Sequence, residues 1–308
     1  MSKKNPTALR GHIACALAYL IFGFNIVVSK NMANSDILSP MDLFCLRAIV
    51  SASLFWFLSL FISKEKVEKK DLLNIFAASI LGLYITQITF LKAITMTTPM
   101  DASILASLSP IMTMFFAALF LKEPITFLKV LGVLLSFAGA LLLITNSLGV
   151  GNVVENTSIQ GALLMLCNSM AFALYLGIFR PLIIKYSVVT YMKWMFLFTV
   201  IVSVPFNITA LVNIEYSVMS TRYLWELAFL TIISTFVAYL LIPIGQKYLR
   251  PTLVSMYSYI QPIVAVLLSV LSGLDVLGWQ KIVASLLVFG GVAIVSKSRS
   301  ANINVMKQ

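Results

Sequence analysis

Charged residues are scarce in this sequence. Asp, Glu, Lys and Arg together make up 11% of its 308 residues, whereas hydrophobic residues make up 60%. An average soluble domain carries about a quarter of its residues as charges, so this composition excludes an ordinary soluble protein. It is typical of a chain that crosses a membrane several times.

Histidine and cysteine are also rare. The one histidine is His12, and Cys15, Cys45 and Cys167 all lie inside apolar segments without a CxxC pair. Metal sites and disulfide frameworks need such residues in clusters. We therefore expect no metal, cofactor or redox role and interpret the cysteines as small packing residues.

Ten apolar runs are long enough to span a bilayer, which takes roughly 20 residues. They lie approximately at 11–31, 42–62, 72–92, 98–121, 126–145, 160–180, 189–212, 224–246, 252–273 and 278–296. The connections between them are short, apart from two polar ones at 146–159 and 213–223. The sequence therefore predicts an all-α polytopic membrane protein with no room for a soluble domain.

The net charge of +11 falls between the apolar runs. If both termini are cytoplasmic, seventeen of the 22 Lys and Arg lie in cytoplasmic segments. The outer side then holds only Lys30, Lys92, Arg222 and Lys281, and Arg47 lies within a helix. This bias follows the positive-inside rule, which explains the basic charge without nucleic acid. It predicts a protein of the plasma membrane, or of the inner membrane in a Gram-negative cell, with both termini cytoplasmic.

A stretch of the first half recurs in the second half. Residues 99–144 align without a gap on residues 251–296, at a constant offset of 152. The matched residues include Pro99 and Pro251, Pro110 and Pro262, Ser103 and Ser255, Lys129 and Lys281, and Gly139 and Gly291. We interpret the chain as a duplication.

Each copy contains five predicted spans, an odd number, so the second copy enters the membrane from the opposite side. The predicted fold is ten transmembrane helices arranged as two inverted five-helix repeats, over residues 11–145 and 160–297. Inverted repeats are typical of secondary transporters, which expose a site near the midplane to each side in turn.

Arg47 is the one basic residue placed inside a span, about five residues from its outer end. At ~1.5 Å per residue this distance is roughly 8 Å, near enough for the side chain to reach the interface. An intramembrane charge is also a functional candidate. Snorkelling, a structural pair with Asp42 or Asp101, and a substrate-facing or gating role stay open.

Asp101 follows Pro99 at the outer start of the fourth span. A carboxylate there can cap the helix and complement its dipole, or it can take part in proton coupling. Glu123 and Asp275, in the turns before the fifth and tenth spans, are interpreted as helix caps.

Pro110 and Pro262 occupy the matching position inside the fourth and ninth spans. Proline removes a backbone hydrogen bond and kinks a helix. In a membrane the freed carbonyl is tolerated where protein or a cavity receives it. We expect the substrate site beside these two prolines, which are candidate kink or gating residues.

Polar and aromatic residues recur near that level. Ser103 and Ser107 share a helix face at spacing four, and the matching Ser255 and Tyr259 do the same. Hydrogen bonding between helices is the alternative use of each such residue. The candidate substrate-binding residues are Asn25, Arg47, Tyr84, Gln87, Ser103, Ser107, Asn168, Tyr175, Ser255, Tyr257, Tyr259 and Gln261. Amides and tyrosines with few fixed charges suit an uncharged or zwitterionic solute.

Five motifs stand out along the chain: Phe22-Gly23-Phe24-Asn25, Ser39-Pro40 through Leu46-Arg47, Ala102 to Pro110, Leu121 to Thr126, and the stretch from Gly132 to Gly139. Together they resemble the EamA-type family of the drug/metabolite transporter superfamily. The resemblance covers nearly all of the chain. It implies ten helices with both termini inside and transport of small organic metabolites, such as amino acids or related compounds, often by export. Coupling to protons or to a second solute stays open.

A membrane-embedded enzyme and a non-transporting sensor or scaffold are the two alternative functional classes. A membrane-embedded enzyme generally needs a nucleophile and base, paired acids or a metal cluster, and a non-transporting sensor or scaffold would be expected to carry a soluble output domain. The sequence shows none of these features. It therefore predicts a transporter that acts on a small-molecule substrate in a lipid bilayer, and not an enzyme.

Overall fold

The structure is a computed structural model that describes residues 6–121, 126–146, 157–214, 216–274 and 278–297. Every regular element in these ranges is a helix, which confirms the predicted all-α class. The predicted turn residues Glu123 and Asp275 lie outside the described residues.

The first half of the chain contains helices α1 to α7. Their bounds are α1 Pro6–Ala33, α2 Pro40–Ser59, α3 Lys69–Ser79, the π-helix η1 Ile80–Ile85, α4 Thr86–Thr95, α5 Pro99–Ala106, α6 Ser109–Leu121 and α7 Phe127–Asn146. Ser39 caps α2 through a capping box, because its hydroxyl accepts from Asp42 N–H while the Asp42 carboxylate accepts from Ser39 N–H.

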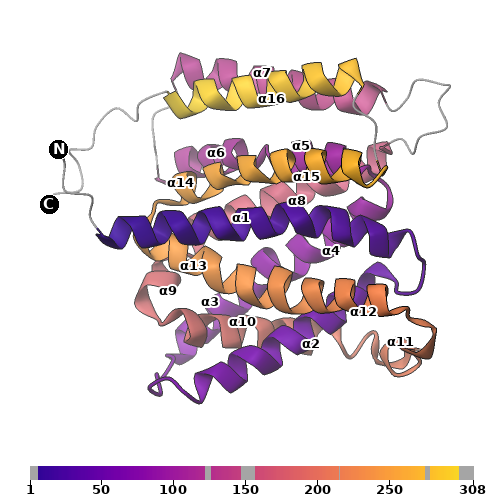
Figure 1. Ribbon diagram of the computed structural model, residues 1–308. Coiled ribbons are helices and arrows are strands. Elements are labelled where there is room, and N and C mark those ends of the chain that lie inside the picture. The colour runs from indigo at the N-terminus through magenta and orange to yellow at the C-terminus, as the bar shows by residue number, and fades with distance from the viewer. Residues whose placement is uncertain (1–5, 122–125, 147–156, 215, 275–277, 298–308) are drawn as a thin grey trace, which may run out of the picture.

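The second half contains α8 to α16. Their bounds are α8 Ile159–Ile178, α9 Arg180–Lys185, α10 Val188–Ser203, α11 Ile208–Val212, the 3₁₀ turn η2 Tyr216–Val218, α12 Thr221–Ala228, the π-helix η3 Phe229–Val237, α13 Ala238–Tyr248, α14 Pro251–Met256, the 3₁₀ turn η4 Tyr257–Tyr259, α15 Ile260–Leu271 and α16 Trp279–Lys297. Figure 1 shows α9 and α11 at opposite ends of the helix bundle.

Seven helical segments in the described ranges are long and apolar enough to cross a membrane. They are Leu9–Ala33, Pro40–Ser59, Lys69–Thr95, Pro99–Phe116, Ile159–Ile178, Thr221–Tyr248 and Leu253–Leu271. Two shorter apolar helices are Val130–Gly139 and Val188–Ser203, and the last predicted span falls on α16. The count of ten spans stays a prediction.

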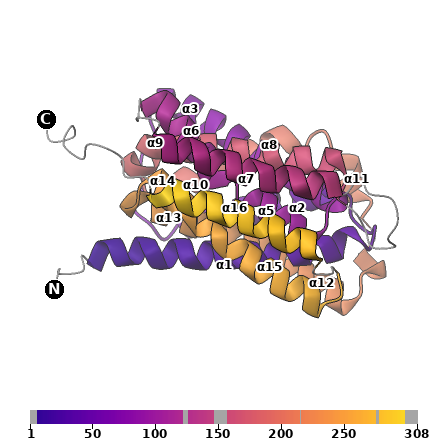
Figure 2. The ribbon, with the colours of Figure 1, turned by 90° about the horizontal axis from the view of Figure 1, so that it is seen from above.

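Helix contacts occur in matching pairs from the two halves. Helix α1 packs against α13 and α15, and α8 packs against α4 and α6. Helices α2 and α10 pack against each other, as do α7 and α16. Figures 1 and 2 show α7 and α16 side by side, in a layer over α5, α6, α14 and α15.

Small residues set the close crossing of α7 and α16. The hydroxyl of Ser136 donates to the carbonyl of Val288 over 3.1 Å. Gly291 lies against the Gly132 carbonyl and Ser136, so close that no side chain fits at position 291. Ser136 and Val288 are themselves equivalent positions at the offset of 152. The crossing therefore brings matching parts of the two copies together.

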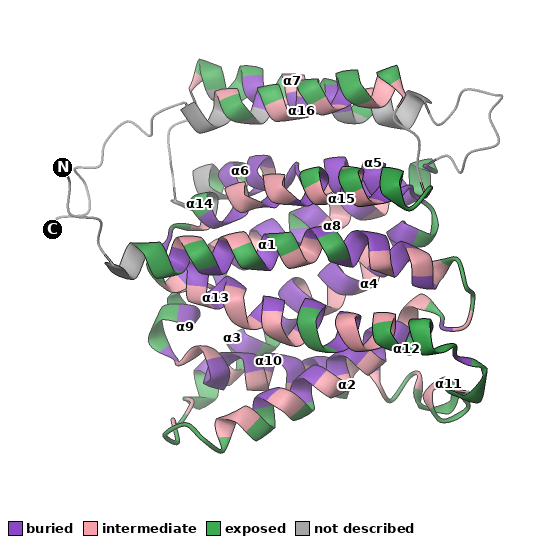
Figure 3. Ribbon diagram, viewed as in Figure 1, coloured by how far each residue is buried: buried purple, intermediate pink, exposed green. Residues whose placement is uncertain are grey.

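Large apolar side chains remain exposed around the outside of the bundle. Leu60, Phe127, Leu134, Leu271 and Trp279 are each at least 60% exposed, and Figure 3 shows exposed residues along α7 and α16. Exposed apolar surface on this scale is unfavourable in water. This apolar surface is therefore suited to contact with the lipids of a bilayer.

The fourth and ninth predicted spans are interrupted just before their prolines. Helix α5 ends at Ala106 and α6 starts at Ser109, so Pro110 lies in the first turn of a new helix. In the second copy, η4 separates α14 from α15, and Pro262 lies in the first turn of α15. Proline has no N–H to donate there, so the first turn of a helix tolerates it. A gating role for either proline stays a prediction.

Candidate functional site

A cavity lies where helices of both halves meet. It is lined by Tyr19, Phe22, Asn25 and Ile26 of α1, Arg47 of α2, Thr86, Gln87 and Phe90 of α4, Ala106 of α5, Ser109 of α6, Met165, Asn168, Ser169 and Phe172 of α8, Tyr239 of α13, Ser258 of η4 and Gln261 of α15. Apolar and aromatic side chains with a few polar groups are the usual lining of small-molecule sites.

Two lining residues come just after π-helical turns. Thr86 follows directly on the π-helix η1, and Tyr239 comes two residues after the π-helix η3. At each π-helix a threonine hydroxyl donates to the carbonyl five residues earlier: Thr86, just after η1, to Leu81, and Thr235, within η3, to Leu230, each over 2.7 Å. π-Helical turns are rare and are frequent at functional sites.

Helix α8 satisfies backbone groups at the irregular segments of the first half. The Asn168 amide donates to the Thr86 carbonyl over 2.6 Å, and the Ser169 hydroxyl donates to the Leu105 carbonyl over 3.4 Å. A carbonyl freed from regular helix bonding is costly in a membrane unless it finds a partner. Asn168 and Ser169 thus stabilise the irregular backbone beside the cavity.

Five lining residues carry buried polar atoms that have no hydrogen-bond partner within the described protein. The atoms are Tyr19 Oη, Arg47 Nη1, Gln87 Oε1, Ser109 Oγ and Ser258 Oγ. Buried polar groups are almost always paired. Their concentration around one cavity indicates that a polar ligand or water binds there.

Arg47 is buried at this cavity, with 2% of its surface exposed. Its Nε donates to Thr235 Oγ1 over 2.7 Å, and its Nη2 donates to Ser234 Oγ over 3.3 Å. Ser234 in turn donates to Asn25 Oδ1 over 2.6 Å. The guanidinium is therefore held inside the bundle by η3, and snorkelling to the interface is the wrong interpretation.

The pairing of Arg47 with Asp42 or Asp101 is also wrong. The Asp42 carboxylate accepts from Ser39 N–H and from the Asn207 amide at 2.6 Å. Among the described residues, no carboxylate forms an ion pair with Arg47. Within the described part of the chain, the guanidinium is hydrogen-bonded to the neutral hydroxyls of Ser234 and Thr235.

Five predicted substrate-binding residues line the cavity: Asn25, Arg47, Gln87, Asn168 and Gln261. The other seven, which lie elsewhere, are Tyr84, Ser103, Ser107, Tyr175, Ser255, Tyr257 and Tyr259. Whether any of these residues binds a substrate stays a prediction.

Local contacts explain why those side chains lie away from the cavity. Ser103 and Ser107 donate to carbonyls of their own helix, Met100 and Ile104. Tyr84 packs edge-on against Phe44, Tyr175 is buried between Phe172 and Phe179, and Tyr259 packs against Phe289. The Tyr257 hydroxyl is hydrogen-bonded to His12 Nδ1 over 2.6 Å, and Ser255 is fully buried.

Sequence reasoning missed most of the aromatic and hydroxyl lining. The missed lining residues include Tyr19, Phe22, Thr86, Phe90, Ser109, Ser169, Phe172, Tyr239 and Ser258. One signal was available, because Ser109 matches Gln261 at the offset of 152 and each directly precedes its proline. No comparable pattern marks Tyr239, which depends on η3.

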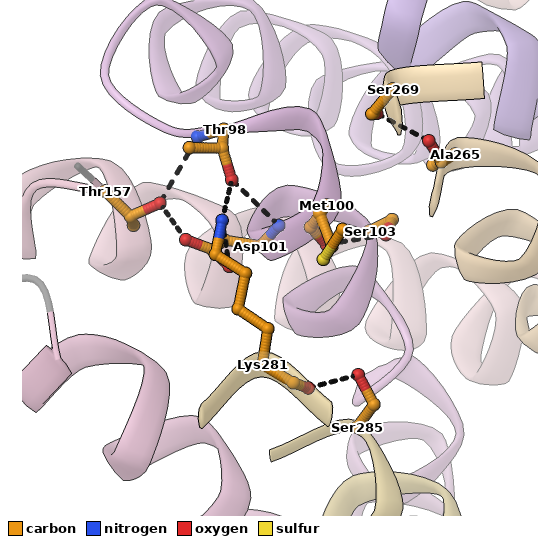
Figure 4. A network of polar contacts seen from close by, with 9 residues as sticks. All are labelled: Thr98, Met100, Asp101, Ser103, Thr157, Ala265, Ser269, Lys281 and Ser285. Atoms are coloured by element: carbon orange, nitrogen blue, oxygen red, sulfur yellow. Dashed lines mark hydrogen bonds and ion pairs between the residues drawn. The ribbon is translucent and has the colours of Figure 1, made fainter. Parts of the chain in front are cut away.

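A buried charge network joins α5 to α16 (Figure 4). Lys281 Nζ lies 3.6 Å from Asp101 Oδ1, and the two side chains are 13% and 5% exposed. The Thr157 hydroxyl donates to Asp101 Oδ2 over 2.6 Å and accepts from Thr98 N–H. Thr98, and not Asp101, is the N-cap of α5, because its hydroxyl accepts from Asp101 N–H. Asp101 itself lies in the first turn of α5, where its carboxylate complements the helix dipole as expected, while the N-cap hydrogen bond comes from Thr98.

A second charge cluster ties the start of α3 and the segment before it to the end of α9. Lys185 Nζ lies 2.6 Å from Asp71 Oδ2 and 2.7 Å from Glu68 Oε1. The Tyr186 hydroxyl donates to Asp71, and the Glu65 carboxylate accepts from Ser187 N–H. Hydrogen bonds to Asp71, and then to Glu68, raise the pKa of Lys185 well above its ordinary value. Lys185 is therefore charged at physiological pH.

Comparison with known proteins supports a transport protein. An uncharacterized transporter of Archaeoglobus fulgidus is 27% identical over 58% of this chain, and the match spans only 60% of that relative's length. The uncharacterized transporter YyaM of Bacillus subtilis is 24% identical over 94% of this chain and 96% of its own. A crystal structure with 19% sequence identity superposes with a TM-score of 0.64, over 96% of this chain and 97% of the other. At that identity the likeness shows the fold alone.

The family comparison covers the chain in two segments. A model of the EamA-like transporter family matches residues 9–145 and again residues 159–297. The matched segments include the cavity-lining residues of both halves. They confirm the resemblance noted in the sequence, and the chain belongs to the EamA-like transporter family.

Proposed function

We propose that the protein is a secondary transporter that binds small organic metabolites, such as amino acids or related compounds, in the central cavity. The observation that carries this proposal is the set of five unpaired buried polar atoms around a cavity shared by both halves. Such groups are stabilised when a hydrogen-bonding solute or water occupies the space. Export across the plasma membrane is the direction that the family resemblance favours.

Alternating access is the proposed mechanism. The gap-free offset of 152 and the matching contacts of α1 with α13 and of α8 with α4 support two inverted repeats of five spans each. Two near-copies in opposite orientation provide two conformations of similar energy, each open to one side. The bias of Lys and Arg supports placing α9 and both termini on the cytoplasmic side.

The composition of the cavity favours transport over chemistry. Among the described lining residues there is no Asp, Glu, His or Cys. General acid–base or nucleophilic catalysis generally uses these residue types. Hydroxyl, amide and aromatic groups instead suit reversible binding.

Blocking the cavity tests the proposal. Ala106 lines the cavity at the end of α5, so Ala106→Phe places an aromatic ring in the binding space. A growth screen of cells that express the protein, in the presence of toxic amino acids and drugs, would identify a transported solute. That solute would then be labelled and used to measure counterflow in proteoliposomes. We expect Ala106→Phe to reduce counterflow at least about tenfold while the protein remains folded, because one ring displaces bound solute.

The matched control is Ala138→Phe, since Ala138 is exposed on the outer side of α7. This variant adds the same ring without entering the cavity and should transport normally. Equal counterflow by the Ala106→Phe variant and the wild type would place the transport path elsewhere.

A further inference from the structure

Arg47 is the only Lys or Arg among the described residues that line the cavity, where there is also no acidic residue. Its guanidinium uses Nε and Nη2 on the hydroxyls of Thr235 and Ser234, and Nη1 has no partner within the described protein. A guanidinium carries five N–H donors, so most of its hydrogen-bonding capacity is unused. Among its described lining residues, the cavity therefore contains a fixed positive charge without a counter-charge.

We propose that Arg47 binds the carboxylate of the transported solute, an inference that rests on the proposed function and names its substrate class. The planar fork of a guanidinium matches the two oxygens of a carboxylate. An ion buried without a partner is strongly unfavourable. A bound carboxylate offsets that cost and supplies the acceptor that the protein lacks.

The rest of the lining limits the charge of the solute. Apart from Arg47, its polar members are neutral, among them Asn25, Gln87, Ser109 and Ser258. A doubly charged phosphate ester would leave one charge buried without compensation. One cation among neutral donors thus favours a group with a single negative charge.

The apolar part of the lining indicates the chemical character of the rest of the solute. Rings of Phe22, Phe90 and Phe172, with Ile26 and Met165, form much of the wall. These side chains suit an apolar or aromatic body attached to the carboxylate. An amino group on the solute has no carboxylate partner here and is not required by the geometry.

The hydroxyls of η3 position the guanidinium. Thr235 also donates to the Leu230 carbonyl, and Ser234 also donates to Asn25 Oδ1. Because each hydroxyl proton is already donated in these bonds, the hydroxyl oxygens of Thr235 and Ser234 act as acceptors for Arg47. Both hydrogens of Nη1 and the second hydrogen of Nη2 consequently remain for the solute.

Matched probes test the charge preference of the purified wild-type protein. The probes are 3-phenylpropanoate, its carboxamide 3-phenylpropanamide, phenethylamine and phenyl phosphate, with dissociation constants taken from ligand-dependent melting curves. We expect 3-phenylpropanoate to bind at least about tenfold more tightly than each of the other three, because only it offers one negative charge. Weaker or equal binding of the carboxylate, or no binding of it at its highest soluble concentration, overturns the proposal.

Variants separate binding by Arg47 from a merely structural role. Arg47→Gln should abolish the preference for 3-phenylpropanoate over its carboxamide, whereas Arg47→Lys should retain part of it. Arg222→Gln, at a cation exposed on α12, should change neither affinity. A proportional loss of both affinities in Arg47→Gln, or an unchanged preference, overturns the proposal. If Arg47→Gln fails to fold, the wild-type preference and Arg47→Lys decide the outcome.

Failure of this inference can be told apart from failure of the proposed function. Counterflow of the carboxamide or the amine that is blocked by Ala106→Phe would retain the transporter and reject the carboxylate. Counterflow that is insensitive to Ala106→Phe would reject the cavity as the transport site.

Discussion

The ion pair between Asp101 and Lys281 is expected to contribute strongly to stability, because it is buried and joins distant helices. The main packing partner of α16 is α7, so this pair is a polar connection from α16 to α5. At a separation of 3.6 Å and an effective dielectric constant of about 20, the Coulomb attraction is about 5 kcal/mol. Desolvation of both charges opposes part of this attraction.

Replacement of one partner removes the neighbouring opposite charge from a site that is largely shielded from solvent. We therefore expect Asp101→Asn and Lys281→Met each to lower the free energy of unfolding by about 3–5 kcal/mol. The double variant removes both charges, so its loss should be smaller than the sum of the single losses by at least ~2 kcal/mol. Reversible unfolding by SDS in mixed micelles measures all three variants against the wild type.

The surface pair Arg222–Glu226 is the matched control. It is an i,i+4 pair in which the Arg222 side chain is 80% exposed, and such pairs contribute only about 0.3–0.5 kcal/mol. A coupling energy between Asp101 and Lys281 no larger than that of the control would refute the reasoning from burial.

Two further predictions concern packing and topology. Ser136→Leu should reduce the amount of folded protein in the membrane, because Ser136 lies against Gly291 at the α7–α16 crossing. Fluorescence-detected size-exclusion chromatography measures this amount, with Ala138→Leu at an exposed neighbouring position as the control. Equal yields of the two variants would contradict the prediction. Single cysteines at Lys64 and Lys185 in a cysteine-free protein should react from the cytoplasm, and one at Ser217 from outside. Labelling at Ser217 only after the cytoplasmic side is opened would contradict the inverted arrangement.

The π-helices η1 and η3 come just before the cavity-lining residues Thr86, Gln87 and Tyr239. Each inserts extra residues into a helical turn, which rotates the following side chains by roughly 100° per residue relative to a regular helix. Tyr84 inside η1 faces Phe44, whereas Thr86 and Gln87 just after it line the cavity. A projection of this span as a regular α-helix does not predict that Tyr84 points away from the cavity while Thr86 and Gln87 line it.

The amino-acid sequence by itself determined the class of protein and much of its organisation. Apolar runs of membrane-spanning length predict helices because backbone groups in a bilayer must bond within their own segment. The repeated prolines, at Pro110 and Pro262, marked where two of those helices are interrupted. The motifs around Asn25 and Arg47 pointed to the correct family and to two cavity residues.

Only the tertiary structure decided which polar groups face the cavity. Ser103 and Ser107 form a polar stripe in sequence, yet their hydroxyls bond to their own helix, which a hydroxyl can do in any regular turn. The partners of Arg47 come from Ser234 and Thr235, nearly 190 residues away along the chain. Contacts between distant helices depend on the packing of the whole bundle, and the local periodicity of one span carries no information about them.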